Sequence, residues 1–346
     1  MEIRALNKDF EQIGKTSIKY FDLMWNRKYY EPGTFTVQIQ ARDYLVDMRY
    51  IYTAERPELG MIQSVEYSDN NEMVVLSGFF YEKKLSDKIV YPVYNGTGTP
   101  EKIAREIVSK YKSDIPKLKL GKITGTGTSI TKQETGGNLD VVLRELLQTE
   151  EKAYRCRYEY VEDAIYIDTY QGVNRTQSQT SNNFVTFSSG FRNIKNIKSK
   201  DDCSNFKNYA VVAGSGQNDE RIYQIVDLSG GGYQQQIFID ARNEKYDRDK
   251  QTLEEYKNGL YQKGIEKLQD YADIHNVEFD AVANKGFVYL QDYDLGDKCD
   301  IIIDVLSKSY EARIIEICEV WNSGKHEVTL TFGDKIPTKY ERARVR

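Results

Sequence analysis

The first 92 residues consist of short stretches in which hydrophobic and polar positions alternate. In residues 34–40, Phe35, Val37 and Ile39 fall on one face of an extended chain, which is the period-two pattern of a half-buried β-strand. Similar stretches recur at 17–25, 50–52, 61–67 and 73–76. Closely spaced strands without helices between them indicate an antiparallel sheet or barrel.

A helical period replaces this alternation after residue 93. Thr99 is a preferred N-cap residue, Pro100 suits the first helical position, and Asn138 is a second N-cap candidate. The apolar stripes that follow are spaced three and four residues apart: Ile103, Ala104, Ile107, Val108 and Tyr111, then Leu139, Val142, Leu143, Leu146 and Leu147. Alternation in 154–167 then predicts a hairpin.

Alternation returns beyond residue 200 and is interrupted by one long helical stretch, residues 250–275. Gly259 and Gly264 weaken this helix by about 1 kcal/mol each relative to alanine. The alternating stretches around it are 209–214, 222–226, 236–239, 298–305, 310–321 and 328–332. These segments predict further strands on both sides of the helix.

The order of these segments predicts an α+β fold that is mainly β, with two β-barrel-like domains, a small α/β insert and one long helix. The expected boundaries are these: a first β-barrel domain at 1–92, completed by strands in 184–200; the α/β insert at 93–175; a second β-barrel domain at 201–335, with a helical insert at 243–275; and a C-terminal tail at 336–346.

Composition narrows the classes of function. The chain has 48 Lys and Arg against 53 Asp and Glu, a net charge of −5, which argues against sequence-specific nucleic-acid binding. No apolar run reaches the ~18–20 residues of a membrane span, and the N-terminus lacks a signal-peptide pattern. Four widely spaced cysteines without a C-x-x-C motif are expected to be free thiols. We therefore expect synthesis and assembly in the cytoplasm.

Tyrosine is abundant, with 27 Tyr against 13 Phe and 2 Trp. A tyrosine side chain joins a large apolar ring to a polar end, which suits both half-buried strands and contacts between subunits. Both interpretations remain open.

The chain shows little sign of catalytic chemistry. Its two histidines, His275 and His326, lie in no catalytic-triad or zinc motif and are expected to be structural surface residues. No spacing singles out a pair of carboxylates for glycoside hydrolysis. We predict no catalytic, cofactor-binding or metal-binding residues, no cofactor and no enzymatic activity.

Two partial motifs fail on inspection. Gly14-Lys15-Thr16 resembles the end of a phosphate-binding loop, but Asp9 stands where the motif requires glycine. The acidic run at 292–297 resembles a calcium loop, but Ile303 occupies the position of the bidentate carboxylate. We expect a turn in each case.

Four local features, in order, carry a likeness to a known family. They are residues 25–37 (WNRKYYEPGTFTV), 77–85 (SGFFYEKKL), 208–214 (NYAVVAG) and the closing strands from 295–299 to 332–333. The sequence resembles the tail hub, or baseplate hub, proteins of tailed phages and phage-tail-like bacteriocins, in particular the hub family of siphophages and prophages of Gram-positive bacteria. Lys88 departs from the arginine expected there, and we expect no fused lysin or fibre domain.

The resemblance implies two similar β-barrels per chain and a homotrimer, in which six barrels match a sixfold tail tube on one side and a threefold tip or spike on the other. The implied partners are the tail tube protein, the tail spike or tip protein, other baseplate proteins and the tape measure protein. The implied location is the tail or baseplate of a virion or phage-tail-like particle. Two alternatives remain: a carbohydrate- or receptor-binding tail-tip module using exposed tyrosines, and a peptidoglycan hydrolase.

Overall fold

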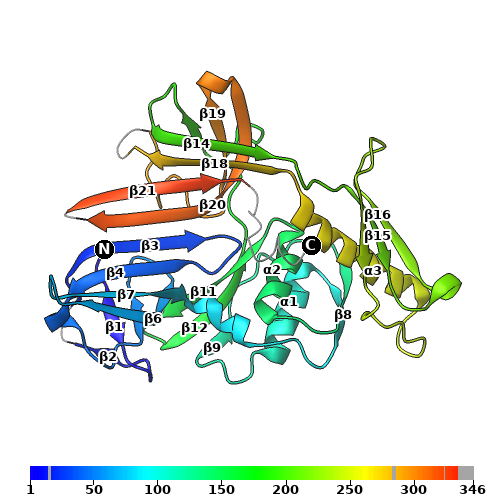
Figure 1. Ribbon diagram of the computed structural model, residues 1–346, viewed down its shortest axis with the longest axis horizontal. Coiled ribbons are helices and arrows are strands. Elements are labelled where there is room, and N and C mark those ends of the chain that lie inside the picture. Colours follow the sequence, from blue (N-terminus) through cyan, green and yellow to red (C-terminus); the bar gives the residue numbers. More distant parts are fainter. Residues whose placement is uncertain (15–16, 283–285, 323, 334–346) are drawn as a thin grey trace.

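The computed structural model describes residues 1–14, 17–282, 286–322 and 324–333, and strands dominate it (Figure 1). One long sheet takes strands from both ends of the chain. One half of the sheet, here the first block, contains in spatial order β3 (Tyr20–Lys28), β4 (Thr34–Gln40), β7 (Met73–Phe80), β6 (Leu59–Ser68), β5 (Tyr50–Tyr52), β1 (Arg4–Leu6) and β2 (Gln12–Ile13). The other half, the second block, contains β20 (Lys308–Asn322), β21 (Lys325–Phe332), β18 (Ile274–Ala281) and β14 (Ile194–Asp202), with β19 (Lys298–Ile303) on β20 and β13 (Thr186–Ser188) on β19.

The two blocks meet at a seam between β3 and β20. These strands pair antiparallel from Lys28 opposite Glu316 to Asp22 opposite Asn322. Outward from the seam each block has the same order: a hairpin, β3–β4 or β20–β21, and then an antiparallel pair, β7–β6 or β18–β14. In both pairs the strand that comes later in the chain lies beside the hairpin. The blocks therefore repeat one arrangement of strands, although the order of its parts along the chain differs.

The alternation predicted for residues 34–40 is confirmed, because Phe35, Val37 and Ile39 are all buried in the core of the first block. The turn before this strand requires Gly33. A Cβ atom there would lie 2.4 Å from the Asn26 carbonyl oxygen and 2.6 Å from the Phe80 ring. Only glycine therefore fits where the β3–β4 turn packs against Phe80.

The first insert follows the first block. Its elements are β8 (Tyr94–Gly98), α1 (Pro100–Tyr111), β9 (Leu118–Leu120), β10 (Ile130–Glu134), α2 (Leu139–Gln148), β11 (Ala153–Glu159) and β12 (Ala164–Tyr170). Both predicted N-caps are confirmed: the side chains of Thr99 and Asn138 accept hydrogen bonds from the backbone of the first turns of α1 and α2. The apolar faces of the helices share one core with Tyr52 and Leu59 of the first block, so the first insert is packed onto that block.

The second insert interrupts the second block between β14 and β18. It contains β15 (Tyr209–Ala213), β16 (Tyr223–Asp227), β17 (Gln236–Asp240) and α3 (Leu253–Leu268). The strands form a separate sheet in the order β16-β15-β17. Thr252 and Glu255 form a capping box at the start of α3, and α3 lies between this sheet and the first insert (Figure 1). Short 3₁₀ helices are η1 (Ala41–Asp43), η2 (Tyr81–Asp87), η3 (Asn218–Glu220), η4 (Gln269–Tyr271) and η5 (Asp304–Leu306).

The mainly β, α+β fold class with one long helix is confirmed, but some expected pairings are wrong. Neither block closes into a barrel within the described ranges. β13 and β14, expected to complete the first barrel, pair with β19 and β18 of the second block. The strands between 209 and 240 lie in the second insert and not in a second barrel, because alternation reveals a strand but not its partner.

The long helix is also shorter than expected. It ends at Leu268, η4 follows, and Ala272 is already extended so that the chain can enter β18. The tail at 336–346 lies outside the described residues.

Candidate interaction surfaces

Arg27, in the first stretch of the family likeness, is almost fully buried beside the seam. Its Nε donates to Glu58 Oε1, and its Nη1 donates to the Tyr289 hydroxyl and to Asp294 Oδ1, each at 2.7 Å. Burial alone would lower the pKa of Arg27, but Glu58, Tyr289 and Asp294 raise it, so the guanidinium stays charged. Because Glu58 precedes β6 and Asp294 precedes β19, this cluster fastens the first block to the second.

A second ion-pair cluster lies on the same sheet. Arg56 donates to both carboxylate oxygens of Glu319, at 2.7 and 2.6 Å, and His326 Nε2 lies 3.0 Å from Glu319 Oε2. Burial raises the pKa of Glu319, but its bonds to His326 and Arg56 outweigh that effect and lower it. His326 also stacks on Trp321, with ring centroids 4.5 Å apart, as expected of a structural residue. The side chain of His275 is not among those described.

A third cluster, here the inter-insert network, joins β10 to the second insert. Lys132 Nζ lies 2.6 Å from Glu266 Oε2 and 3.2 Å from Glu134 Oε2. Lys263 bridges Glu134, at 3.7 Å, and Glu244, at 3.4 Å. Burial would lower the pKa of Lys132, but the two glutamates raise it; burial raises the pKa of Glu244. The charges therefore hold the two inserts together as one unit.

Of the two partial motifs, the acidic run at 292–297 has a structural use. In the acidic run, Asp297 accepts hydrogen bonds from the Val173 backbone and the Arg175 side chain. The Asp297 backbone N–H donates to the Asp294 carbonyl at 3.1 Å, which is the expected turn. Among the described residues no group of three or more His, Cys, Asp or Glu could hold a metal ion. Lys15 and Thr16 lie outside the described part of the chain.

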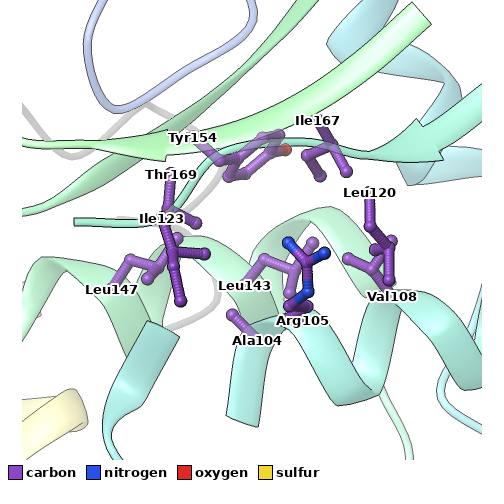
Figure 2. Close-up of a pocket in the computed structure, with 10 residues that line it drawn as sticks. All are labelled: Ala104, Arg105, Val108, Leu120, Ile123, Leu143, Leu147, Tyr154, Ile167 and Thr169. Carbon is purple, nitrogen blue, oxygen red and sulfur yellow. The ribbon is translucent and has the colours of Figure 1, made fainter. Parts of the chain in front are cut away.

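A small cavity of about 20 Å³ lies inside the first insert, between helices α1 and α2 and the β11–β12 strands (Figure 2). Its walls are mostly apolar, and Figure 2 shows Leu143 and Tyr154 facing each other across it. Arg105 donates to the Gly121 carbonyl at 2.7 Å at its margin. This volume holds about one water molecule, so the cavity is a packing gap and not a ligand site.

The second insert leaves one face of its sheet uncovered; we call this the outer face. Val211 of β15 stands between Ile225 of β16 and Phe238 of β17 in a single row across the sheet. Ile225 is 51% exposed and Phe238 is 58% exposed. The Arg221 guanidinium lies 5.7 Å from the centre of the Phe238 ring. An apolar face of this kind on a soluble protein marks a contact surface.

The structure places tyrosines both in the core and on the surface. Several buried tyrosines donate their hydroxyls to backbone carbonyls elsewhere in the chain: Tyr29 to Glu151, Tyr81 to Pro116 and Tyr111 to Pro92. Others are exposed, among them Tyr67, Tyr91 and Tyr233. Part of the tyrosine content thus joins elements within the chain, and part is available on the surface.

The sequence matches a siphovirus family, described as Siphovirus ReqiPepy6 Gp37-like protein, over residues 1–334. The chain belongs to this family. Its resemblance to phage tail proteins, read from the sequence, is thereby confirmed. A comparison with curated proteins gave no match.

Solved structures with the same fold are also tail proteins. A tail protein from Neisseria meningitidis MC58 has a TM-score of 0.62 at 11% identity, covering 96% of each chain. Prophage tail protein gp18 from Listeria monocytogenes EGD-e has a TM-score of 0.60 at 11% identity, covering 100% of this chain and 98% of that one. The prophage MuSo2 43 kDa tail protein from Shewanella oneidensis has a TM-score of 0.57 at 14% identity, covering 96% and 98%. At these identities the likeness is one of fold.

In this tail protein the outermost strand of the second block, β14, pairs only with β18 among the described strands. It carries the exposed lysines Lys195, Lys198 and Lys200, and a register shift falls between Lys195 and Lys198. Lysines and irregular register on an edge strand oppose the addition of another strand. Contacts with neighbours are therefore expected through side chains at this edge. In the described part of the chain no helix is long and apolar enough to cross a bilayer.

Sequence reasoning named none of the buried ion pairs as functional or structural sites. In β10 the inward positions hold Lys132 and Glu134, where a buried strand ordinarily carries apolar residues. These charged residues at inward positions could have indicated buried ion pairs. They do not identify Glu266 or Lys263 as partners, since both lie more than 120 residues away.

Proposed function

We propose that this tail protein is a structural, non-catalytic hub: a homotrimer that joins the sixfold tail tube to a threefold tip or spike complex. The observation that carries the proposal is the repeated strand order on either side of the β3–β20 seam. One chain contributes two similar blocks, so three chains contribute six. Six blocks can meet a sixfold tube while the assembly itself keeps threefold symmetry.

The connections between the blocks support this role. A ring of six similar blocks needs a fixed spacing within each chain as well as between chains. The seam supplies seven paired positions, and the Arg27–Glu58 and Arg56–Glu319 pairs add charged bonds that are shielded from solvent. Since breaking a buried pair costs about 3–5 kcal/mol, the spacing of the two blocks is held against forces transmitted along the tail.

The inserts support contacts beyond the ring. They lie together at one end of the long sheet (Figure 1), and the outer face of the second insert is apolar and exposed. We assign the tail tube protein, the tip or spike protein and the tape measure protein to the blocks, and other baseplate proteins to the inserts. Assembly takes place in the bacterial cytoplasm, and the finished location is the end of the tail.

Native mass spectrometry and electron microscopy of the purified protein test the proposal. We expect a particle containing three copies of the 40.1 kDa chain, with six similar lobes around a central opening. A dimer, a ring of another symmetry, or a trimer without six lobes would contradict it. A protein that stays monomeric even with the tail tube protein added would also contradict it.

A further inference from the structure

A cleft of about 760 Å³ lies between the two inserts. One wall is the antiparallel β8–β10 pair of the first insert, and the other is the segment 242–251 that leads into α3. Its volume falls within the ~300–1,000 Å³ range of small-molecule sites. Most residues of its walls carry polar or charged ends, although aliphatic side-chain carbon and Val93 supply much of the exposed lining.

Side-chain amides line both walls of the cleft. Asn95 and Gln133 are directly opposite each other in the β8–β10 pair, and Asn243 and Gln251 come from the other wall. Gln133 Nε2 and Gln251 Nε2 both donate to the Lys245 carbonyl, at 3.3 and 3.4 Å. Each amide offers both donors and an acceptor, so the cleft presents hydrogen-bonding groups of both kinds at defined positions.

The charge of the cleft is opposite to that of the whole protein. It is lined by three cations, Arg242, Lys245 and Lys250, and one acid, Asp247, a balance of +2, whereas the chain carries −5. Lys250 pairs with Asp247 at 2.8 Å, and Arg242 pairs with Asp240 at 2.6 Å. Lys245 makes no ion pair with any described residue, so its ammonium is available to a negatively charged ligand.

Buried ion pairs of the inter-insert network fix the two walls of the cleft. Gln133 lies between Lys132 and Glu134 in sequence, and both of these residues belong to the inter-insert network. Asn243 and Lys245 flank Glu244, which belongs to the same network through Lys263. Lys263 therefore joins the two walls, because it pairs with Glu134 of one wall strand and with Glu244 of the other wall segment. A site whose walls are fixed before binding loses less entropy when it binds.

We infer that this cleft binds an anionic oligosaccharide. Sugar hydroxyls donate and accept at once and match paired amides, and an acidic substituent matches Lys245. An apolar ligand would leave the amides and the ammonium of the walls without hydrogen-bond partners. A single-stranded nucleic acid would need aromatic stacking surfaces, and none of the residues lining the cleft is aromatic. The site stands independently of the oligomeric state proposed above.

Isothermal titration calorimetry of the full chain with hexagalacturonate tests the site. Maltohexaose is the neutral counterpart, and the oligonucleotide dT6 is the anionic chain without sugar-ring hydroxyl pairs. We expect hexagalacturonate to bind at least about tenfold more tightly than either, because maltohexaose lacks the carboxylates that pair with Lys245 and dT6 lacks the hydroxyl pairs that match the amides. Raising the salt concentration should weaken this binding.

Variants locate the binding. Lys245→Gln should weaken it about tenfold, and Gln133→Ala should weaken it severalfold. Lys19→Gln is the matched control, since Lys19 is also exposed but lies in the first block, and it should leave the affinity within about twofold. Thermal unfolding should be unchanged in all three variants.

Specific outcomes would overturn the inference. Hexagalacturonate that fails to bind at millimolar concentration, or that binds Lys19→Gln as weakly as Lys245→Gln, rules out this cleft. Equal binding of dT6 rules out a preference for glycans, and equal binding of maltohexaose rules out a role for the cations.

Discussion

The two glycines of α3 face different surroundings, and replacing each by alanine should have opposite effects. A Cβ atom at Gly259 would meet nothing within 4 Å. A Cβ atom at Gly264 would lie 2.4 Å from Val226 Cγ2 and 2.9 Å from Val212 Cγ2, because the helix packs closely on β15 and β16. From sequence alone, both glycines weaken the helix by the same amount, about 1 kcal/mol.

The magnitudes follow from these distances. Gly259→Ala should stabilise α3 by about 1 kcal/mol through helix propensity. Gly264→Ala gains the same propensity, but apolar atoms ordinarily sit about 3.5–4.0 Å apart, so α3 must move by about 1 Å or more. Overpacking of this kind costs about 1–3 kcal/mol, and we expect a net loss of up to about 2 kcal/mol.

Hydrogen exchange of the α3 amides measures this directly, because it reports local opening without requiring the whole chain to unfold in one step. Gly259→Ala should slow exchange about fivefold, and Gly264→Ala should accelerate it by up to about thirtyfold. In a Val226→Ala background the cost of Gly264→Ala should fall, since the nearest clashing atom is gone. If Gly264→Ala slows exchange as much as Gly259→Ala does, the close packing of α3 on its sheet is wrong.

Three further changes test the buried charges. Burial raises the pKa of Glu82 to about 7 from its ordinary 4.5, so the free energy of unfolding should fall as pH rises from about 4.5 to 7. Urea unfolding at a series of pH values measures this slope, and Glu82→Gln should flatten it. An unchanged slope would contradict the assignment. Lys132→Met should lower the free energy of unfolding by about 3–5 kcal/mol in denaturant unfolding, and adding Glu266→Leu should recover much of the loss. A double variant less stable than the single variant would refute the network. Arg27→Met should cost about 3–5 kcal/mol by leaving the buried Glu58 carboxylate without its partner. A loss below about 1 kcal/mol would show that the seam does not depend on Arg27.

Local signals in the sequence predicted the local structure well. Thr99 and Asn138 cap their helices because a cap depends on residues three positions away. The predicted pairing of β13 and β14 is wrong because their partners, β19 and β18, lie far along the chain. An alternating pattern identifies a strand but not the strand with which it pairs. The same holds for β15, whose alternation suits the outer face of an insert as well as a barrel wall.

The candidate cleft could not be predicted for a related reason. Asn95, Gln133 and Lys245 are ordinary polar surface residues in sequence, and nothing in their spacing brings them together. Asn95 and Gln133 become neighbours through the β8–β10 pairing, and Lys245 joins them where Lys263 pairs with both β10 and the segment before α3. A site that depends on contacts between inserts has no signature within either insert.

The β3–β20 pairing cannot form until most of the chain has been synthesised. β3 is among the earliest strands to leave the ribosome, but its partner spans residues 308–322. At about 5–20 residues per second, translation delays that meeting by roughly 15–60 s. During this interval one side of β3 is an unpaired strand edge, and such edges pair with strands of other chains. Nascent copies translated close together on one messenger RNA are therefore at risk of pairing with each other before either is complete.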